Sequence, residues 1–582
     1  MIRTAIRHRS FYPFVQPLAR DRAIFLLEAA KEDLSLCRML WWKRSTPETR
    51  YLADMSVRYS DAELSQWHTQ ICFPETVHYI KYCFFIRDRQ GRCFRLDARG
   101  LSETDTDEDL FSVSRAADSP YLSSLPDGGC FEVLQINPTD LLRVPDWAAG
   151  AVYYQIFPDR FRKDTHRETT LDGTERLDAW NAAPTRDNYL GGTLKGIHEK
   201  LPYIKELGAD CIYLNPIFRG DFNHKYATTD YFEVDPMFGT KEELNALVSA
   251  AHKAGLRVIL DGVFNHTGIH FAPFADWLEK GDKSAFADWF YPLGEKRAIS
   301  ADCYECVGDY PYMPRLNGSC PGVRAYVKEV LLYWLRKAGI DGWRLDVADE
   351  LDRHALSYWA EEVKKEFPQA LLLGETWGDA SLLTAPGGTD TAMNYLFRDC
   401  MTAYFAAGTL NETGLACRLY NMLMRYPDAV DHAMFNLLGS HDTPRFLTLC
   451  GESKEKLRMA AAFQMMFIGA PSVYYGDEAG MTGDNDPGCR GGMNWDTPDT
   501  GLTEYIKQLT GIRKAHIAVR TGSFRILEAN DNEHMFAFER VYENDRVLAV
   551  FNSDSRSHTT DFAGTAGSVD VPPLSVKIIT NP

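Results

Sequence analysis

Residues 257–264 read Arg257-Val-Ile-Leu-Asp-Gly-Val-Phe264, a short apolar run that follows a stretch whose apolar residues have helical spacing, Gly239–Ala254. A helix that leads into a buried strand is the repeating unit of parallel α/β folds. The run carries Asp261 and continues directly into Asn265 and His266. This stretch is therefore interpreted as one unit of a parallel sheet, with polar side chains where its strand ends.

Similar apolar runs of strand length lie on both sides of this unit. They are Val152–Phe157, Cys211–Pro216, Gly342–Val347, Ala370–Glu375, Ala392–Leu396, Met434–Gly439 and Ser472–Tyr475. Amphipathic segments such as Val323–Ala338 and Arg353–Phe367 lie between them. Eight strands that alternate with helices over about 350 residues predict a (β/α)8 TIM barrel, because such barrels span about 200 to more than 400 residues.

The two ends of the chain have a different sequence pattern. Short aromatic-rich runs are separated by polar turns, which is typical of β-sandwiches. The gap from Phe264 to Val323 is too long for a structureless loop, so it predicts a subdomain inserted after the third strand. The predicted domains are an N-terminal β-sandwich at 1–140, the barrel at 141–505 with its insertion at 265–322, and a C-terminal β-sandwich at 506–582.

Composition excludes several classes of protein. The 582 residues are 45% hydrophobic, which suits a globular chain with large cores. A net charge of −18 repels phosphate backbones and anionic lipids, so neither nucleic acid nor a membrane is an expected partner. Thirteen cysteines, an odd number, suit reduced thiols, and the first thirty residues lack a signal-peptide core. We therefore expect a cytoplasmic protein.

Chemistry is expected at the strand ends, because the βα loops of a barrel gather at one mouth. Three of these ends carry the acids Asp346, Glu375 and Asp442. Two carboxyl groups that face one substrate are what glycosidic cleavage needs. Arg344 shares a strand face with Asp346 and is predicted to keep that carboxylate ionised.

Other interpretations of these residues remain open at this level. Strand-end acids commonly cap helices or pair with basic side chains. His266 and His441 are possible zinc ligands, although neither has a partner at a usual ligand spacing. Cys303 and Cys306 form a lone Cys-x-x-Cys, for which buried or loop thiols compete with a zinc or redox role.

The motifs resemble those of one family. The segments Asp261–His266, Gly342–Val347, Gly374–Trp377 and Ser440–Asp442 closely resemble the four best-known motifs of the α-amylase family, glycoside hydrolase family 13, and Val152–Phe161 and Gly469–Glu478 match two flanking motifs. Met313-Pro-Arg-Leu-Asn317 resembles the Met-Pro-Lys-Leu-Asn motif of the neopullulanase, cyclomaltodextrinase and maltogenic amylase group. The N-terminal region is similar to the extra β-sandwich of that group.

The resemblance implies a role for each matching residue. Asp346 would be the nucleophile, Glu375 the general acid/base and Asp442 the stabiliser of the cation-like sugar. Five residues would line the same sugar subsite: Asp261, Asn265, His266, Arg344 and His441. Tyr226, beside His224, would stack on a glucose ring, and Trp377 would either pack against the next glucose or belong to the core.

The implied function is a retaining hydrolase of α-glucosidic, mainly α-1,4, bonds in cyclomaltodextrins, pullulan and malto-oligosaccharides, with transglycosylation as a second outcome. The alternatives are an oligo-α-glucosidase, a glucanotransferase, or a catalytically silent glycan-binding protein. The N-terminal domain would either bind starch or form the interface of a homodimer.

Three departures from the family pattern stand out. The chain has Val347-Ala-Asp-Glu350 where the group has Val-Ala-Asn-Glu, and Lys225-Tyr-Ala-Thr228 where relatives have Lys-Tyr-Asp-Thr. In place of a calcium loop it has Arg162-Lys-Asp-Thr-His-Arg167, whose basic residues make a poor oxygen cage. No cofactor is expected for the chemistry, and structural calcium is not favoured.

Overall fold

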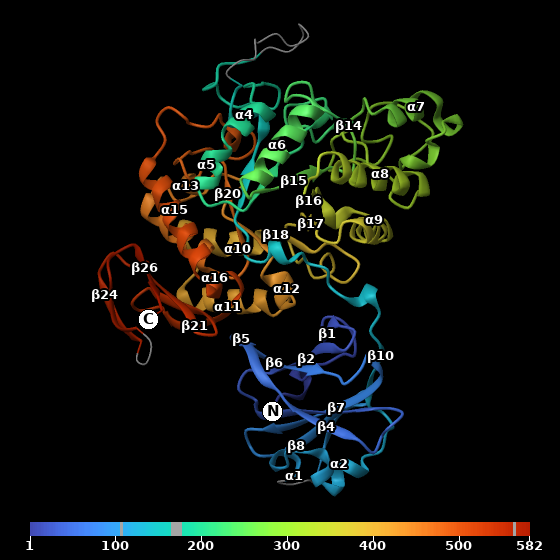
Figure 1. Cartoon of the computed structure of the whole chain (residues 1–582), viewed down its shortest axis with the longest axis vertical. Coiled ribbons are helices and arrows are strands. Elements are labelled where there is room, and N and C mark those ends of the chain that lie inside the picture. The colour runs from blue at the N-terminus through green and yellow to red at the C-terminus, as the bar shows by residue number, and fades with distance from the viewer. Residues whose placement is uncertain (105–108, 165–176, 563–565, 582) are drawn as a thin grey trace. The chain divides into compact units, whose positions relative to one another are not determined.

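The computed structural model describes residues 1–104, 109–164, 177–562 and 566–581 (Figure 1). The chain divides into two compact units. One contains Met1–Leu142 and Gly414–Asp428, and the other contains Arg143–Thr413 and Ala429–Pro582. The division between Leu142 and Arg143 lies close to the predicted boundary at residue 140.

The first unit contains the N-terminal β-sandwich. One sheet has the order β1-β2-β6-β5 and the other has the order β4-β3-β7-β8-β9, with β10 paired to β7. The strands are β1 (Val15–Ala19), β2 (Arg22–Ala30), β3 (Leu34–Lys43), β4 (Arg50–Asp54), β5 (Ser56–Ser60), β6 (Leu64–Cys72), β7 (His78–Asp88), β8 (Cys93–Asp97), β9 (Gly100–Glu103) and β10 (Phe131–Gln135).

Strand β7 is buried on both faces. Tyr82 and Phe84 point into the core between the two sheets, whereas Cys83 and Phe85 point into a smaller core with Leu122. Side chains alternate between the faces of a strand, so an uninterrupted apolar run is what burial on both faces requires. Two short helices contribute to the smaller core, α1 (Asp109–Ser112) and α2 (Pro120–Ser124).

The second unit contains a closed barrel of eight parallel strands, each within or overlapping one of the eight predicted runs (Figure 1). They are β11 (Tyr153–Ile156), β12 (Cys211–Leu214), β15 (Arg257–Gly262), β16 (Gly342–Leu345), β17 (Leu371–Gly374), β18 (Thr391–Asn394), β19 (Phe435–Leu437) and β20 (Ala470–Tyr474). Inward side chains such as Tyr153, Tyr213, Ile259 and Phe435 fill the interior. The predicted TIM barrel is confirmed.

The predicted helices are present with shifted ends, as α6 (Lys241–Lys253), α8 (Pro321–Lys337) and α9 (Arg353–Glu366). The start of α6 is set by a capping box, in which Thr240 and Glu243 satisfy each other's backbone N–H groups. Its apolar face, which includes Leu244 and Leu247, is buried. Among the described residues, no helix is long and apolar enough to cross a bilayer.

The segment between β15 and α8 forms the insertion after the third barrel strand. Apart from α7 (Ala272–Lys280) it consists of short turns and isolated bridges, such as Phe290 with Leu316. Phe274 and Trp277 each pack edge to face with Tyr304, at centroid distances of 5.0 and 6.0 Å, and their own rings are tilted at 5.5 Å. Aromatic packing thus provides the insertion with a core of its own.

The chain ends in two small sheets, with the orders β21-β22-β23-β26 and β24-β25. Their strands are β21 (Ser523–Asn530), β22 (Met535–Tyr542), β23 (Asp545–Asn552), β24 (His558–Phe562), β25 (Gly567–Val571) and β26 (Ser575–Thr580). Val550 and Val571 share a core between these sheets. The predicted boundary at 506 falls inside a helix, α15 (Thr500–Ala515), because Leu502, Ile506 and Leu509 form one continuous buried face.

Candidate active site

Three neighbouring barrel strands bring acids to one edge of the sheet. In the parallel register Asp261 of β15 is opposite Arg344 of β16, and Leu345 is opposite Gly374 of β17. Asp346 and Glu375 therefore follow the ends of adjacent strands. Backbone hydrogen bonds continue the strand pairing to both acids. The Asp346 N–H donates to the Gly262 carbonyl and the Glu375 N–H donates to the Leu345 carbonyl, each at 3.0 Å.

The Arg344 guanidinium lies at the centre of this acid cluster. Its Nη1 is 2.7 Å from Asp346 Oδ1 and 2.8 Å from Asp261 Oδ1, and its Nη2 is 2.7 Å from Glu375 Oε2. All four side chains are buried. One cation therefore holds three carboxyl groups together, and two of them are predicted catalytic acids.

The charge balance of this cluster differs from the sequence prediction. Arg344 contacts Asp346 as predicted, but burial raises the pKa of Asp346 well above its ordinary value, and the Glu375 and Asp261 carboxylates raise it further. The Arg344 charge opposes this effect without overcoming it. Burial and the two neighbouring acids therefore act against the Arg344 charge, which is shared among three carboxyl groups.

A strained residue follows Asp346. Val347 has φ 45° and ψ 49°, a left-handed conformation that a β-branched residue rarely adopts. This turn directs the Val347 N–H to Glu375 Oε2 at 2.8 Å, and the Ala348 N–H donates to the Glu375 carbonyl at 3.0 Å. Strain at this position is compensated by contacts that fix Glu375 against the Asp346 loop.

Asp442 is joined to the same cluster through histidine and tyrosine. Its Oδ2 is 3.0 Å from His441 Nε2, and His441 Nε2 is 2.5 Å from the Tyr226 hydroxyl. That hydroxyl donates to Asp261 Oδ2 at 2.9 Å. The three predicted catalytic acids are thus connected by hydrogen bonds and ion pairs to a single network.

The tautomer of His441 follows from its neighbours. Nδ1 faces two amide donors, Gln155 Nε2 at 2.9 Å and Asn215 Nδ2 at 3.1 Å, so Nδ1 accepts and Nε2 carries the proton. Burial and the nearby Arg490 and Arg344 charges hold the pKa of His441 well below its ordinary value. A neutral His441 therefore donates toward Asp442 and Tyr226.

His266 is the least satisfied side chain of the cluster. It is 2% exposed, neither ring nitrogen has a hydrogen-bond partner among the residues that the structure describes, and Nε2 is 3.9 Å from Asp346 Oδ2. Burial lowers the pKa of His266 to about 3, so the ring is neutral. A buried imidazole without partners beside an acid is a ready site for a hydroxyl group of a ligand.

The remaining predicted residues have different surroundings. Asn265 donates to Glu350 Oε2 at 3.0 Å, and His224 Nδ1 accepts from the Tyr226 N–H at 3.1 Å. Trp377 donates to Glu375 Oε1 at 3.3 Å and stacks on Tyr395 with a centroid distance of 4.1 Å. Because Trp377 is 53% exposed, it is a surface residue and not part of the core.

The sequence analysis missed several members of the network. Gln155 and Asn215 are polar residues within or beside apolar strands, a signal that marks inward-facing functional positions in a barrel. Arg490 donates to Asp442 Oδ1 at 3.1 Å and to the His441 carbonyl at 2.7 Å. It follows β20 in a long loop, where no periodic pattern indicates which side chain returns to the site.

Within the described residues, no group of three or more His, Cys, Asp or Glu side chains is arranged to hold a metal ion. In the candidate calcium loop, Asp164 pairs with Lys195 at 3.1 Å, and Thr165–Arg167 lie outside the described residues. The described part of the loop, with Arg162 and Lys163 beside that ion pair, does not fit a calcium cage.

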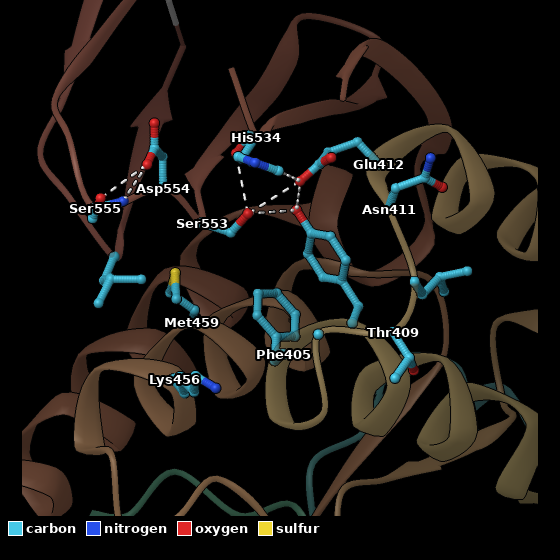
Figure 2. Close-up of a pocket in the computed structure, with 14 residues that line it drawn as sticks. Phe405, Thr409, Asn411, Glu412, Lys456, Met459, His534, Ser553, Asp554 and Ser555 are labelled. Atoms are coloured by element: carbon cyan, nitrogen blue, oxygen red, sulfur yellow. Dashed lines mark hydrogen bonds and ion pairs between the residues drawn. The ribbon is translucent and has the colours of Figure 1, made fainter. Parts of the chain in front are cut away.

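A hollow of about 690 Å³ is lined by residues from the segment 404–412, from helix α14 (Lys454–Met466) and from the C-terminal sheet region (Figure 2). Glu412 dominates its polar lining, and its Oε1 accepts from Tyr404 and Ser553, both at 3.1 Å. The other oxygen, Oε2, is buried and has no hydrogen-bond partner within the described residues. The hollow contains none of the predicted site residues.

Comparison with known proteins places this geometry in a family. The alpha amylase catalytic domain matches residues 155–519, and the alpha amylase N-terminal ig-like domain matches residues 1–116. The chain is 36% identical to a cyclomaltodextrinase of Geobacillus thermopakistaniensis over 96% of this chain and 92% of that protein. It is 35% identical to neopullulanase 2 of Thermoactinomyces vulgaris, with the same coverage of 96% and 92%.

A solved cyclomaltodextrinase structure superposes with a TM-score of 0.88 at 31% identity, covering 98% of both chains. The catalytic-domain match alone extends over more than half of the sequence. The chain belongs to the α-amylase family of glycoside hydrolases.

Proposed function

We propose that this enzyme hydrolyses α-1,4-glucosidic bonds of cyclomaltodextrins, pullulan and malto-oligosaccharides with retention of configuration. The observation that carries the proposal is the contact of one guanidinium with both Asp346 and Glu375, at 2.7 Å each. Two carboxyl groups so close together suit the roughly 5–5.5 Å separation of retaining enzymes better than the roughly 6.5–9.5 Å of inverting ones.

In the proposed mechanism, Glu375 acts as the general acid and gives a proton to the glycosidic oxygen, while the Asp346 carboxylate attacks the anomeric carbon. Glu375 then removes a proton from water, which releases the glucosyl group from Asp346. Asp442 stabilises the positive charge that develops on the sugar ring. The unpartnered nitrogens of His266 are placed to bind a sugar hydroxyl near Asp346.

The substrate class is supported by the relatives, whose names include cyclomaltodextrinase and neopullulanase. The exposed ring of Trp377, fixed against Tyr395 and joined to Glu375, offers an apolar face for a glucose unit beside the acid. An oligo-α-glucosidase or a glucanotransferase would use the same acids, so product analysis on pullulan and β-cyclodextrin separates these activities.

Proton NMR of the first product released from β-cyclodextrin tests the proposal. We expect the α-anomer to appear first and to mutarotate later, and β-anomer as the first product would contradict retention. Asp346→Ala should lower kcat by roughly 10⁴-fold or more while circular dichroism shows a folded protein, because no other group can form the covalent bond. Undiminished turnover by this variant would exclude Asp346 as the nucleophile.

We further propose a cytoplasmic enzyme that acts as a homodimer. All thirteen cysteines are free thiols, which suits a reducing compartment. The homodimer rests on the resemblance of the N-terminal sandwich to that of the neopullulanase group. Light scattering of the full chain would test it, and a mass near 66 kDa, that of one chain, would contradict it.

The proposed chemistry requires no metal, because proton transfer and nucleophilic attack are both assigned to carboxyl groups. Dialysis against EDTA should therefore leave kcat/KM on β-cyclodextrin within about twofold of its starting value. A loss that added Ca²⁺ restores would show that the enzyme depends on a calcium site. Thermal unfolding in the same samples would distinguish a stabilising ion from one needed for turnover.

A further inference from the structure

Two cysteines of the N-terminal sandwich face each other across a strand pair. In the antiparallel register of β10 and β7, Phe131 is opposite Tyr82 and Val133 is opposite Ile80. One further step in this register, to the residue that precedes β10, would bring Cys130 opposite Cys83, and each thiol shifts the pKa of the other. Opposed residues in an antiparallel pair have Cα atoms about 4.5–5.5 Å apart, within the roughly 4.4–6.8 Å range of disulfides.

The two thiols differ in their access to solvent. Cys83 is fully buried in the small core with Phe85 and Leu122. Cys130 lies at the margin of the same core and is only partly buried. A small reagent can therefore reach Cys130 first, whereas Cys83 is accessible only through its neighbour.

The surroundings favour a thiolate on Cys130. Arg95 Nη2 is 3.3 Å from its sulfur, and the Arg99 side chain lies against Gly129. The hydrogen bond from Cys83 and the Arg95 charge lower the pKa of Cys130 to about 7 in spite of burial. The same hydrogen bond and burial raise the pKa of Cys83 well above its ordinary value. The Cys130 sulfur is therefore the nucleophile of the pair, and Cys83 remains the protonated thiol.

Other cysteines of the chain lack this arrangement. Burial raises the pKa of Cys450 and of Cys489 to about 12, and it also raises that of Cys306. Thiols of this kind are inert because they are almost fully protonated at neutral pH. A low pKa, partial access and an opposed second thiol come together at Cys130.

We propose that Cys130 and Cys83 form a peroxide-sensitive pair that closes to a reversible disulfide between β10 and β7. The Cys130 thiolate attacks one oxygen of hydrogen peroxide, the O–O bond breaks, and hydroxide leaves and is protonated to water. Sulfur is oxidised to sulfenic acid and peroxide is reduced. The Cys83 sulfur, losing its proton, then attacks the Cys130 sulfur and expels hydroxide, which that proton converts to water. A dithiol reductant restores both thiols by exchange.

The full-length enzyme is treated with hydrogen peroxide at neutral pH, alkylated and digested. Peptide mass spectrometry should find Cys83 joined to Cys130, with the loss of two hydrogens and recovery by dithiothreitol. Cys130 should also react with limiting iodoacetamide at least about tenfold faster than exposed Cys72, because the reactive form is the thiolate. Equal rates, or oxidation of Cys130 without a bond to Cys83, would overturn the proposal.

Variants separate the roles of the two sulfurs. Cys83→Ser should leave sulfenic acid on Cys130, trapped by dimedone, and Cys130→Ser should give no cross-linked peptide. Cys93→Ser, on the adjacent strand β8, is the matched control and should retain the disulfide. Arg95→Gln should slow the alkylation of Cys130 about tenfold at pH 7, whereas Arg92→Gln at the start of the same hairpin should not. If a variant fails to fold, the relative alkylation rates of Cys130 and Cys72 in the wild-type enzyme still test the proposal.

Discussion

At the residue scale, Asp442 depends on a side chain from a distant loop. It is the most exposed of the three acids, with 28% of its side chain accessible, and Arg490 is the guanidinium that contacts it. Arg490 is itself buried and also donates to the His441 carbonyl. A buried cation that touches both an acid and its neighbour's backbone fixes where that acid points.

Arg490→Gln should lower kcat on β-cyclodextrin by about 10- to 100-fold with a smaller change in KM, because Asp442 loses its orientation in the transition state. Steady-state kinetics would measure both parameters. Arg186→Gln is the matched control, since Arg186 forms an exposed ion pair with Asp486, a residue that Arg490 also contacts. Equal losses in both variants would assign the effect to the Asp486 loop and not to Asp442.

The sequence could predict the acids but not the groups that position them. Asp346, Glu375 and Asp442 each follow an apolar strand, so their place in the barrel follows from local pattern. The contact of Arg490 with Asp442 joins residues 48 positions apart through a loop without periodicity. The sharing of Arg344 could not be predicted for a related reason, because this arginine contacts three acids only in the folded barrel.

At the scale of elements, α15 belongs to the barrel. Its Arg513 is fully buried and donates to the carbonyls of Gly150, Met465 and Gly469, which flank β11 and β20. No carboxylate of the described residues forms an ion pair with it, and burial lowers the pKa of Arg513 well below its ordinary value. The residue acts as a hydrogen-bonding staple across the ends of two neighbouring strands.

Arg513→Met should lower the free energy of unfolding by about 2–4 kcal/mol, because it leaves several buried carbonyl groups without a donor. Lys514→Ala is the matched control. Lys514 forms a partly exposed ion pair with Asp210 at 3.4 Å, and its loss should cost about 0.5 kcal/mol or less. Urea unfolding followed by tryptophan fluorescence would measure both, and a loss for Arg513→Met no larger than the control would contradict the role.

The barrel strands were predictable because a strand that faces core on both sides must be apolar throughout. The C-terminal boundary of the barrel domain could not be predicted in this way. The alternating runs after residue 530 indicate sheets, but the helix before them has a buried face that the sequence alone cannot assign to either domain. Leu502 and Ile506 could cover a sheet as well as a barrel, and only Arg513 shows which.

At the scale of the whole molecule, a buried histidine makes the stability of the first compact unit depend on pH. In the first unit, His8 is buried among Tyr82, Phe84 and Phe131, and its Nδ1 is 2.6 Å from the Leu26 carbonyl. Burial lowers the pKa of His8 from 6.5 to about 4. The unfolded chain binds this proton more tightly, so the stability of the sandwich is lost as pH falls from above 6.5 towards 4.

This shift corresponds to about 2 kcal/mol of unfolding free energy lost between pH 8 and pH 5. Calorimetry over that range should show the transition of the N-terminal sandwich moving to lower temperature. His8→Gln should flatten this dependence, whereas His78→Gln, at an exposed position of the same sandwich, should not. If the transition temperature of His8→Gln still falls with pH as in the wild type, other groups are responsible for the acid sensitivity.

The packing of the C-terminal sheets bears on how this enzyme can be shortened or recombined. Phe463 of helix α14 (Lys454–Met466) packs against Phe536, Phe538 and Phe551 at 5.1–5.9 Å, and Arg540 donates to the Met466 carbonyl. Deleting the last seventy residues would remove the three phenylalanines that pack against α14 and would expose Phe463. A chimera that takes its C-terminal sheets from another amylase must therefore also take the α14 helix of that amylase, so that the packed surfaces match.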